Sequence, residues 1–251
     1  MSFDNVFDTF GTLGETPIFF FCDHATATIP RAFHDLGLDR RFLRSHIAHD
    51  IGAKDLTLSL ASTFGARAIC SDFSRLLVDP NRSMDRSDHI PEVSDGIEVP
   101  GNMNLSATDR EERIARFFEP YHQALSEEID AVRRAFDDAL FVSVHSFTPR
   151  LHESHEDRPW HLGVLWAHDE PTARAFMAAA QTRAPDFLIG DNKPYDARGF
   201  NYTVDRHIKP LGLRHLTLEV RQDLLADEAS VKSMSRLLAA AIGDLMERET
   251  A

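Results

Sequence analysis

An apolar run that ends on a histidine is the feature of this chain that most constrains its fold. Residues 140–144 read Leu-Phe-Val-Ser-Val, and His145 follows them directly, before Ser-Phe-Thr-Pro at 146–149. A short apolar run of this kind is typical of a strand that is buried on both faces of a parallel sheet. Residues at the carboxyl ends of such strands line the ligand crevice of an α/β fold. We therefore expect an α/β protein in which His145 faces a cleft.

A second apolar run ends in the same way. Residues 17–22 read Pro-Ile-Phe-Phe-Phe-Cys and lead into Asp23-His24. A single histidine is more often a hydrogen-bonded residue of the core than a ligand, and that alternative remains for both positions. Two histidines at the ends of two buried strands nevertheless favour a metal site, because both strand ends open onto the same crevice.

The third ligand of such a site is less clearly marked. A catalytic zinc takes three protein ligands from His, Asp and Glu and keeps one position open. Asp23 is next to the first histidine, but neighbouring side chains on an extended segment point apart. Asp50, on a helix predicted after the first strand, is the preferred candidate, and His46 and His49 are weaker ones.

Strand-like and helix-like stretches alternate along the whole chain, as in α/β layer folds. No linker, repeat or low-complexity segment interrupts them, so residues 1–251 are predicted to form a single domain. The expected strands are 17–22, 66–70, 75–79, 140–145, 162–166 and 216–220. The expected helices are 30–36, 39–64, 107–138, 170–184 and 229–248, and long loops are expected at 80–104, 150–161 and 189–206.

The composition narrows the possible functions. The net charge is −13 at pH 7, so binding to nucleic acid or to an anionic membrane is not expected. No segment approaches the roughly 18 consecutive apolar residues of a membrane helix. Residues 1–4 lack the basic and apolar regions of a signal peptide, and Cys22 and Cys70 cannot build a disulfide framework. We expect a protein of the reducing cytoplasm.

A cluster of arginine and asparagine suits a substrate carboxylate. Residues 75–82 read Arg-Leu-Leu-Val-Asp-Pro-Asn-Arg. Arginine pairs with a carboxylate in a two-pronged fork, and asparagine adds a donor and an acceptor. The alternative is a loop ion pair between Arg82 and Asp79 or Asp85.

An acid inside an apolar run is the last feature that indicates chemistry. Glu219 lies in Leu-Thr-Leu-Glu-Val at 216–220. A buried carboxylate is costly unless it is paired or has a chemical role. The alternative is a structural salt bridge that involves Arg221 and Asp223.

Taken together, these residues resemble the N-formylglutamate amidohydrolase family, as a divergent branch. The ordered segments cover residues 17 to 225, nearly the whole chain, and the set is more specific than any one of them. They are Asp23-His24-Ala25, Ile29-Pro30, His49-Asp50-Ile51-Gly52-Ala53, Ser74-Arg75-Leu76-Leu77-Val78-Asp79-Pro80-Asn81-Arg82, Val144-His145-Ser146-Phe147-Thr148-Pro149, Gly190-Asp191-Asn192-Lys193-Pro194-Tyr195 and Leu218-Glu219-Val220-Arg221-Gln222-Asp223-Leu224.

The resemblance implies a fold and a set of roles. The family is similar to the zinc carboxypeptidases and aspartoacylases, which implies a three-layer α/β/α fold with a mixed, mostly parallel sheet, of the phosphorylase/hydrolase type. One zinc, or another divalent metal, is expected on the matching metal positions, and the general base on the matching acid. The metal positions are His24, Asp50 and His145; the base is Glu219; the pair that holds the substrate carboxylate is Asn81 and Arg82; candidates for a second carboxylate are Arg75, Arg158 and Arg221; and Tyr195 is a further donor.

These roles imply an enzyme of amino-acid catabolism that removes the formyl group of an N-acyl amino acid such as N-formyl-L-glutamate. A water activated by the metal would attack the amide, and Glu219 would act as general base. One alternative is the same chemistry on a longer N-acyl amino acid, or on a peptide in the manner of a zinc carboxypeptidase. A non-enzymatic protein that binds a dicarboxylate is the other alternative. The sequence leaves the oligomeric state open.

Overall fold

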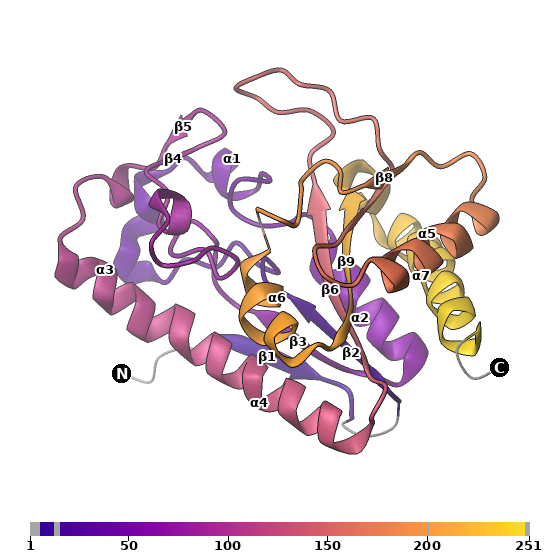
Figure 1. Ribbon diagram of the computed structural model, residues 1–251. Coiled ribbons are helices and arrows are strands. Elements are labelled where there is room, and N and C mark those ends of the chain that lie inside the picture. Colours follow the sequence, from indigo (N-terminus) through magenta and orange to yellow (C-terminus); the bar gives the residue numbers. More distant parts are fainter. Residues whose placement is uncertain (1–5, 13–15, 200, 249–251) are drawn as a thin grey trace.

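A seven-stranded sheet runs through the computed structural model, which describes residues 6–12, 16–199 and 201–248. The strand order is β1-β3-β2-β6-β9-β7-β8 (Figure 1). The pairs β1–β3 and β7–β9 are antiparallel, and the other neighbouring pairs are parallel. The predicted mixed, mostly parallel sheet is therefore confirmed. Its strands are β1 (Phe7–Phe10), β2 (Ile18–Cys22), β3 (Arg67–Ser71), β6 (Leu140–Phe147), β7 (Leu162–Leu165), β8 (Ile189–Asp191) and β9 (Arg214–Arg221).

Helices cover both faces of this sheet (Figure 1). The apolar side chains of α2, α5 and α7 pack in one core, and those of α4 and α6 pack in a second core on the other face. Each core lies between the sheet and one layer of helices, so the fold has the three layers of an α/β/α architecture. The α-helices are α1 (Arg40–Leu43), α2 (Ala53–Phe64), α3 (Ala107–Arg113), α4 (Glu119–Ala135), α5 (Glu170–Arg183), α6 (Tyr202–His207) and α7 (Glu228–Arg248).

The central strands are mostly apolar because both of their faces are buried. In β2, Ile18 and Phe20 enter the core with α2 and α7, whereas Phe19 and Phe21 enter the core with α4. Successive side chains of a strand point to opposite faces, so a strand between two helical layers needs apolar residues at every position. Burial of each such side chain stabilises the fold by roughly 1.5–3 kcal/mol. A charged residue in these strands is therefore exceptional.

The single helix predicted over 39–64 is wrong, because α1 and α2 are separate. Gly52 precedes α2 with a φ of 78°, in the left-handed region that favours glycine. A Cβ atom at this position would lie 2.4 Å from the Cβ of Leu225. The chain turns here, and Asp50 lies in that turn. The sequence pattern had predicted Asp50 to lie on a helix.

The strand predicted over 75–79 is also wrong, since this segment is a turn. The N–H of Leu77 donates to the carbonyl of Ser74 at 2.9 Å, and Arg75 pairs with Asp79 across the turn. The apolar side chains between these two charged residues are buried in the core with α4. A short apolar run in a turn cannot be told from a strand by its pattern alone.

The predicted long loops contain short elements. Residues 80–104 include the hairpin β4 (Val93–Ser94) and β5 (Ile97–Glu98), and residues 189–206 contain β8 and most of α6. A π-helical turn at Ile114–Phe118 divides the helix predicted at 107–138. Among the described helices, none is long and apolar enough to cross a membrane. Residues 1–5, which include the start examined for a signal peptide, lie outside the described part.

Candidate metal centre and active site

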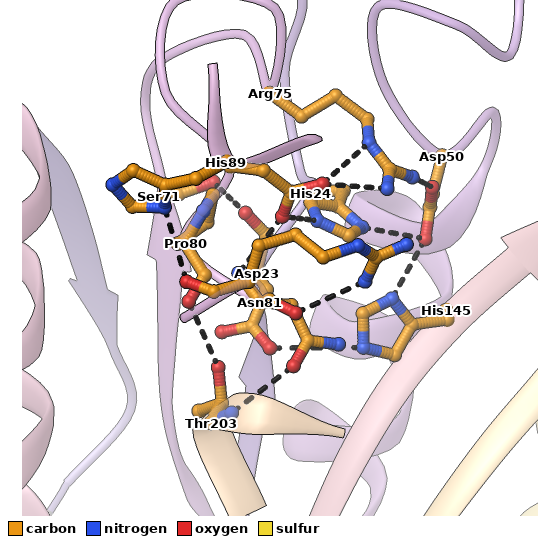
Figure 2. A network of polar contacts seen from close by, with 12 residues as sticks. Asp23, His24, Asp50, Ser71, Arg75, Pro80, Asn81, His89, His145 and Thr203 are labelled. Atoms are coloured by element: carbon orange, nitrogen blue, oxygen red, sulfur yellow. Dashed lines mark hydrogen bonds and ion pairs between the residues drawn. The ribbon is translucent and has the colours of Figure 1, made fainter. Parts of the chain in front are cut away.

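Three buried side chains from separate parts of the chain meet at the carboxyl ends of the central strands. His24 follows β2, Asp50 lies in the turn before α2, and His145 belongs to β6. Their ligand atoms all lie within 4.8 Å of one another. Figure 2 shows both imidazole rings beside the Asp50 carboxylate. The fold thus brings together the three residues predicted to be metal ligands.

The same nitrogen of each ring faces the same carboxylate oxygen. Nδ1 of His24 lies 3.4 Å from Oδ2 of Asp50, and Nδ1 of His145 lies 2.8 Å from it. Nδ1 of His24 is buried and has no hydrogen-bond partner among the described residues. Two imidazole nitrogens and one carboxylate oxygen form a donor set that suits zinc and other divalent first-row metals.

A carboxylate stands behind each imidazole. Nε2 of His24 lies 2.7 Å from Oδ1 of Asp79, and Nε2 of His145 lies 3.7 Å from Oδ2 of Asp23. The Tyr121 hydroxyl donates to the other oxygen of Asp23 at 2.7 Å. Metal-binding histidines usually donate their second N–H to such a carboxylate, which fixes the tautomer and the ring orientation. This arrangement leaves Nδ1 of both rings for a metal.

The charges of the cluster also favour a cation. Burial alone would raise the pKa of Asp50, but the His24 and His145 imidazoles hold it well below its ordinary value. Burial opposes the charged form of His145, yet the carboxylates of Asp50, Glu219 and Asp23 outweigh burial and raise its pKa to about 9. A proton on His145 therefore compensates part of the negative charge of these carboxylates, which a divalent metal would otherwise neutralise. Metal binding at such a site displaces that proton. The charges and donor atoms of these residues therefore fit a divalent metal ion.

Glu219 lies beside this cluster because of the pairing of two strands. It is directly opposite His145 in the parallel register of β6 and β9. Its side chain is buried, and its Oε2 atom has no hydrogen-bond partner in the described part of the chain. Burial raises the pKa of Glu219 to about 7. A carboxylate with this pKa can both accept and release a proton near neutral pH.

The predicted alternative of a salt bridge near Glu219 is not what the structure shows. Arg221 lies at the end of β9, where its guanidinium donates to both oxygens of Asp223 at 2.7 and 3.1 Å. It also donates to the carbonyl of Pro159 at 3.1 Å. The fold therefore directs Arg221, one of the predicted site residues, away from the cluster.

Asn81 and Arg82 follow Asp79 at the edge of the cluster. The side-chain oxygen of Asn81 accepts from the backbone N–H of Thr203 at 3.0 Å, so its amide NH₂ is left to donate to a ligand (Figure 2). Arg82 donates through Nε to Asp88 at 3.1 Å and through one NH₂ group to the Asn81 carbonyl at 3.0 Å. A loop ion pair of the expected kind thus exists, and it joins Arg82 to Asp88.

Asp79 holds Arg75 as well as His24. Its Oδ2 atom accepts two hydrogen bonds from the Arg75 guanidinium, at 2.6 and 3.1 Å. The remaining NH₂ group of Arg75 lies 3.5 Å from Oδ1 of Asp50. One acid therefore orients both an imidazole and a guanidinium at the edge of the cluster.

The candidate metal ligands, Glu219 and the Asn81–Arg82 pair line one small cavity of about 50 Å³. Eight of the ten residues proposed from the sequence border it, Arg158 and Arg221 being the exceptions, and Ser146 is the one further lining residue. Tyr195 reaches the cavity because its loop crosses β7 at Gly163, where a Cβ atom would lie 2.0 Å from the Lys193 carbonyl. The lining residues are His24, Asp50, Arg75, Asn81, Arg82, His145, Ser146, Tyr195 and Glu219.

The comparisons agree with this geometry. The family model described as N-formylglutamate amidohydrolase matches residues 16–226. The chain belongs to this family. The matched region contains every residue that lines the cavity, and the predicted resemblance is confirmed. No curated protein matches the chain.

Two solved structures of other proteins are similar to this chain. The Atu2144 gene product of Agrobacterium tumefaciens is 30% identical, with a TM-score of 0.90, and the match covers 98% of this chain and 96% of that one. An N-formylglutamate amidohydrolase from Ralstonia eutropha JMP134 is 18% identical, with a TM-score of 0.69 and 97% coverage of both chains. The second likeness shows the fold alone.

Sequence reasoning missed the roles of Asp23 and Asp79. Asp23 was not preferred as a ligand because neighbouring side chains of an extended segment point apart, which directs it away from His24. In the structure Asp23 points toward His145. Asp79 was considered only as an ion-pair partner, although it lies two residues before Asn81. The two weaker ligand candidates lie elsewhere: His46 pairs with Asp95 at 2.9 Å, and the partly buried His49 does not border the cavity.

Asp79 allows a first prediction. Asp79→Asn keeps the size of the side chain but removes the charge behind His24, so we expect metal affinity to fall by about 10- to 100-fold. Competition with a chelator measures this change. Asp88→Asn, which removes a partner of Arg82 outside the cavity, is the matched control and should retain metal. An unchanged affinity in Asp79→Asn would contradict the role of Asp79 as the support of a ligand.

Proposed function

We propose that this protein is a metal-dependent amidohydrolase that cleaves the acyl group from an N-acyl amino acid. One observation carries the proposal: the convergent His24, Asp50 and His145 share a cavity with Glu219 and with the Asn81–Arg82 pair. A metal site, an acid with a raised pKa and a carboxylate clamp are the parts that hydrolysis of such an amide requires. A binding protein for a dicarboxylate has no need of a buried acid beside a metal site.

Each residue has a role in this proposal. His24, Asp50 and His145 would hold a divalent metal, zinc being the first candidate, and the bound ion would supply Lewis-acid activation of water and of the acyl carbonyl. Glu219 takes the proton from the attacking water and delivers it to the leaving amine nitrogen, while the C–N bond breaks and a C–O bond forms. Arg75, fixed by Asp79 and Asp50, presents a cation to the carbonyl oxygen as charge develops there.

The substrate is held by its carboxylate. Arg82 and the amide NH₂ of Asn81 bind that group and place the amide between the metal site and Glu219. Family membership makes N-formyl-L-glutamate the first compound to test, with formate and glutamate as products. An activity of this kind belongs to amino-acid catabolism.

Metal analysis combined with a formate-release assay on N-formyl-L-glutamate tests the proposal. One divalent metal per chain and release of formate would support both the chemistry and the substrate. Bound metal without release of formate would be consistent with a hydrolase of another substrate, and other N-acyl amino acids would be tested next. Protein that neither retains nor takes up Zn²⁺ or Mn²⁺, and that hydrolyses none of these compounds, would refute the proposal.

The carboxylate clamp gives a second prediction. Arg82→Lys keeps the positive charge but loses the planar fork, so we expect KM to rise about tenfold with little change in kcat. Steady-state kinetics on the substrate identified above measures both constants. Arg86→Lys is the matched control, because Arg86 binds the same Asp88 and does not line the cavity. An unchanged KM in Arg82→Lys would exclude the fork.

A further inference from the structure

A second and larger cavity opens beside the metal centre. Its volume is about 290 Å³, and it shares Asp50, Arg75, Ser146 and Tyr195 with the cavity of the metal centre. Neither Asn81 nor Arg82 lines it. We call this space the side chamber. Its other walls come from the turn before α2, the β4–β5 hairpin and the segment that runs from the end of β6 to residue 158; they are His46, Ile47, Ser94, Asp95, Phe147, Thr148, Leu151, Glu153 and Arg158.

The side chamber contains a buried arginine without an acidic partner. Arg158 is 7% exposed, and among the described residues it forms no ion pair with a carboxylate. One NH₂ group donates to the Tyr195 hydroxyl at 2.9 Å, and the guanidinium lies 4.9 Å from the centre of the Tyr195 ring. Arg75, at the junction of the two cavities, differs because Asp79 and Asp50 neutralise it.

The acids that border the side chamber are engaged elsewhere. Asp50 faces the two metal-site imidazoles. The Asp95 carboxylate accepts from the backbone N–H groups of His152 and Glu153 at 2.7 and 3.0 Å, and it lies 2.9 Å from the His46 ring. Glu153 is exposed. A buried guanidinium that lacks a counter-ion in the folded chain is costly, unless an anionic ligand supplies one.

We propose that the side chamber binds a second carboxylate of the substrate and that Arg158 is the residue that selects for it. This inference rests on the proposed function. Arg158 supplies up to two further NH groups in a planar fork, which matches a carboxylate. The Tyr195 oxygen accepts from Arg158, so its own hydrogen remains to donate to the same anion. The substrate thus spans from Asn81–Arg82, across the metal centre, into the side chamber.

Two parts of an N-acyl amino acid could carry this second carboxylate. It lies either on the side chain of the amino acid or at the far end of the acyl group. Two matched pairs of compounds separate these sources. N-formyl-L-glutamate against N-formyl-L-glutamine tests the side chain, and N-succinyl-L-alanine against the N-succinamoyl compound, its neutral amide, tests the acyl group.

The measurement is the ratio of kcat/KM within each pair. We expect the metal-loaded wild type to prefer the dianion by at least about tenfold in one pair, because a charged hydrogen bond to a buried group is at stake. In Arg158→Gln this ratio should fall at least tenfold relative to wild type. Loss in the glutamate pair places the carboxylate on the amino-acid side chain, and loss in the succinyl pair places it on the acyl group. Equal ratios in wild type and Arg158→Gln would overturn the proposal.

Three variants separate selection from structural damage. Arg158→Lys keeps a cation and should retain more of the preference than Arg158→Gln. Tyr195→Phe removes the hydroxyl that Arg158 binds, and it should keep a higher ratio than Arg158→Gln if the guanidinium is the selector. Arg150→Gln changes an exposed arginine of the same segment, paired with Asp157, and should have the wild-type ratio.

Binding provides a readout that does not depend on turnover. The four compounds are titrated calorimetrically into Glu219→Gln and into the double variant Glu219→Gln/Arg158→Gln. A dianion preference that is lost in the double variant supports the side chamber even if the wild type hydrolyses none of the compounds, a result that would refute the proposed function. No preference in Glu219→Gln would overturn the inference about Arg158.

Discussion

His145→Ala should lose the bound metal and the activity together. The change removes one of three convergent ligand atoms and leaves Nδ1 of His24 and Oδ2 of Asp50 as the remaining donors. A catalytic zinc needs three protein ligands, so we expect the metal content to fall from one per chain to near zero at equal zinc supply. Elemental analysis after gel filtration, with the amide-hydrolysis assay on the same sample, measures both.

A matched histidine variant shows whether this loss is specific. His46→Ala alters a partly buried histidine that pairs with Asp95 outside the metal cluster, and it should retain the metal. Thermal unfolding of both variants checks that they are folded, since His145 lies in a central strand. A folded His145→Ala protein with a full complement of metal would remove His145 from the ligand set.

Glu219→Gln should separate metal binding from catalysis. The amide has the size of the carboxylate but cannot take a proton from water, so turnover should fall by at least about 100-fold. The metal content should stay at the wild-type level, because Glu219 is not among the three convergent ligands. Burial raises the pKa of Glu219 to about 7, and this group is the acid in the cavity that is suited to proton transfer near neutral pH.

Another glutamate provides the control for this substitution. Glu228→Gln changes an exposed residue at the start of α7 that pairs with Lys232, and both turnover and metal content should be unchanged. If Glu219→Gln turned over substrate at the wild-type rate, Glu219 would not be the base. If instead it lost the metal along with the activity, Glu219 would belong to the ligand set.

The local pattern of the chain was sufficient for β2 and β6 and for the histidines at their ends. The apolar runs before His24 and around His145 are short, and such runs are typical of a strand between two helical layers. Glu219 was recognisable for the same reason, because an acid within an apolar strand contradicts the pattern around it. These features depend on consecutive residues, and the sequence states them directly. Asp50 and the Asn81–Arg82 pair were also proposed from the residues themselves, and the family resemblance assigned them their roles.

The pattern failed where long-range packing sets the backbone. Whether 39–64 is one helix or two depends on Gly52, and its left-handed turn is imposed partly by the close approach of Leu225 from the far end of the chain. The segment 75–79 looked like a strand because a buried turn and a buried strand share the same apolar residues. Both errors concern segments that position the candidate metal site. The first segment places Asp50 in a turn, and the second places Arg75 beside Asp79.

The sequence by itself thus determined which side chains are candidates for the chemistry, and the tertiary structure decided which of them meet. The parallel register of β6 and β9 sets Glu219 opposite His145, although the two are far apart in the chain. Three arginines were equivalent candidates for a second carboxylate. Folding neutralises Arg75 with Asp79, turns Arg221 toward Asp223, and buries Arg158 in the side chamber without an ion pair to any carboxylate of the described residues. The physical reason is that charge compensation depends on neighbours in space, which local sequence does not specify.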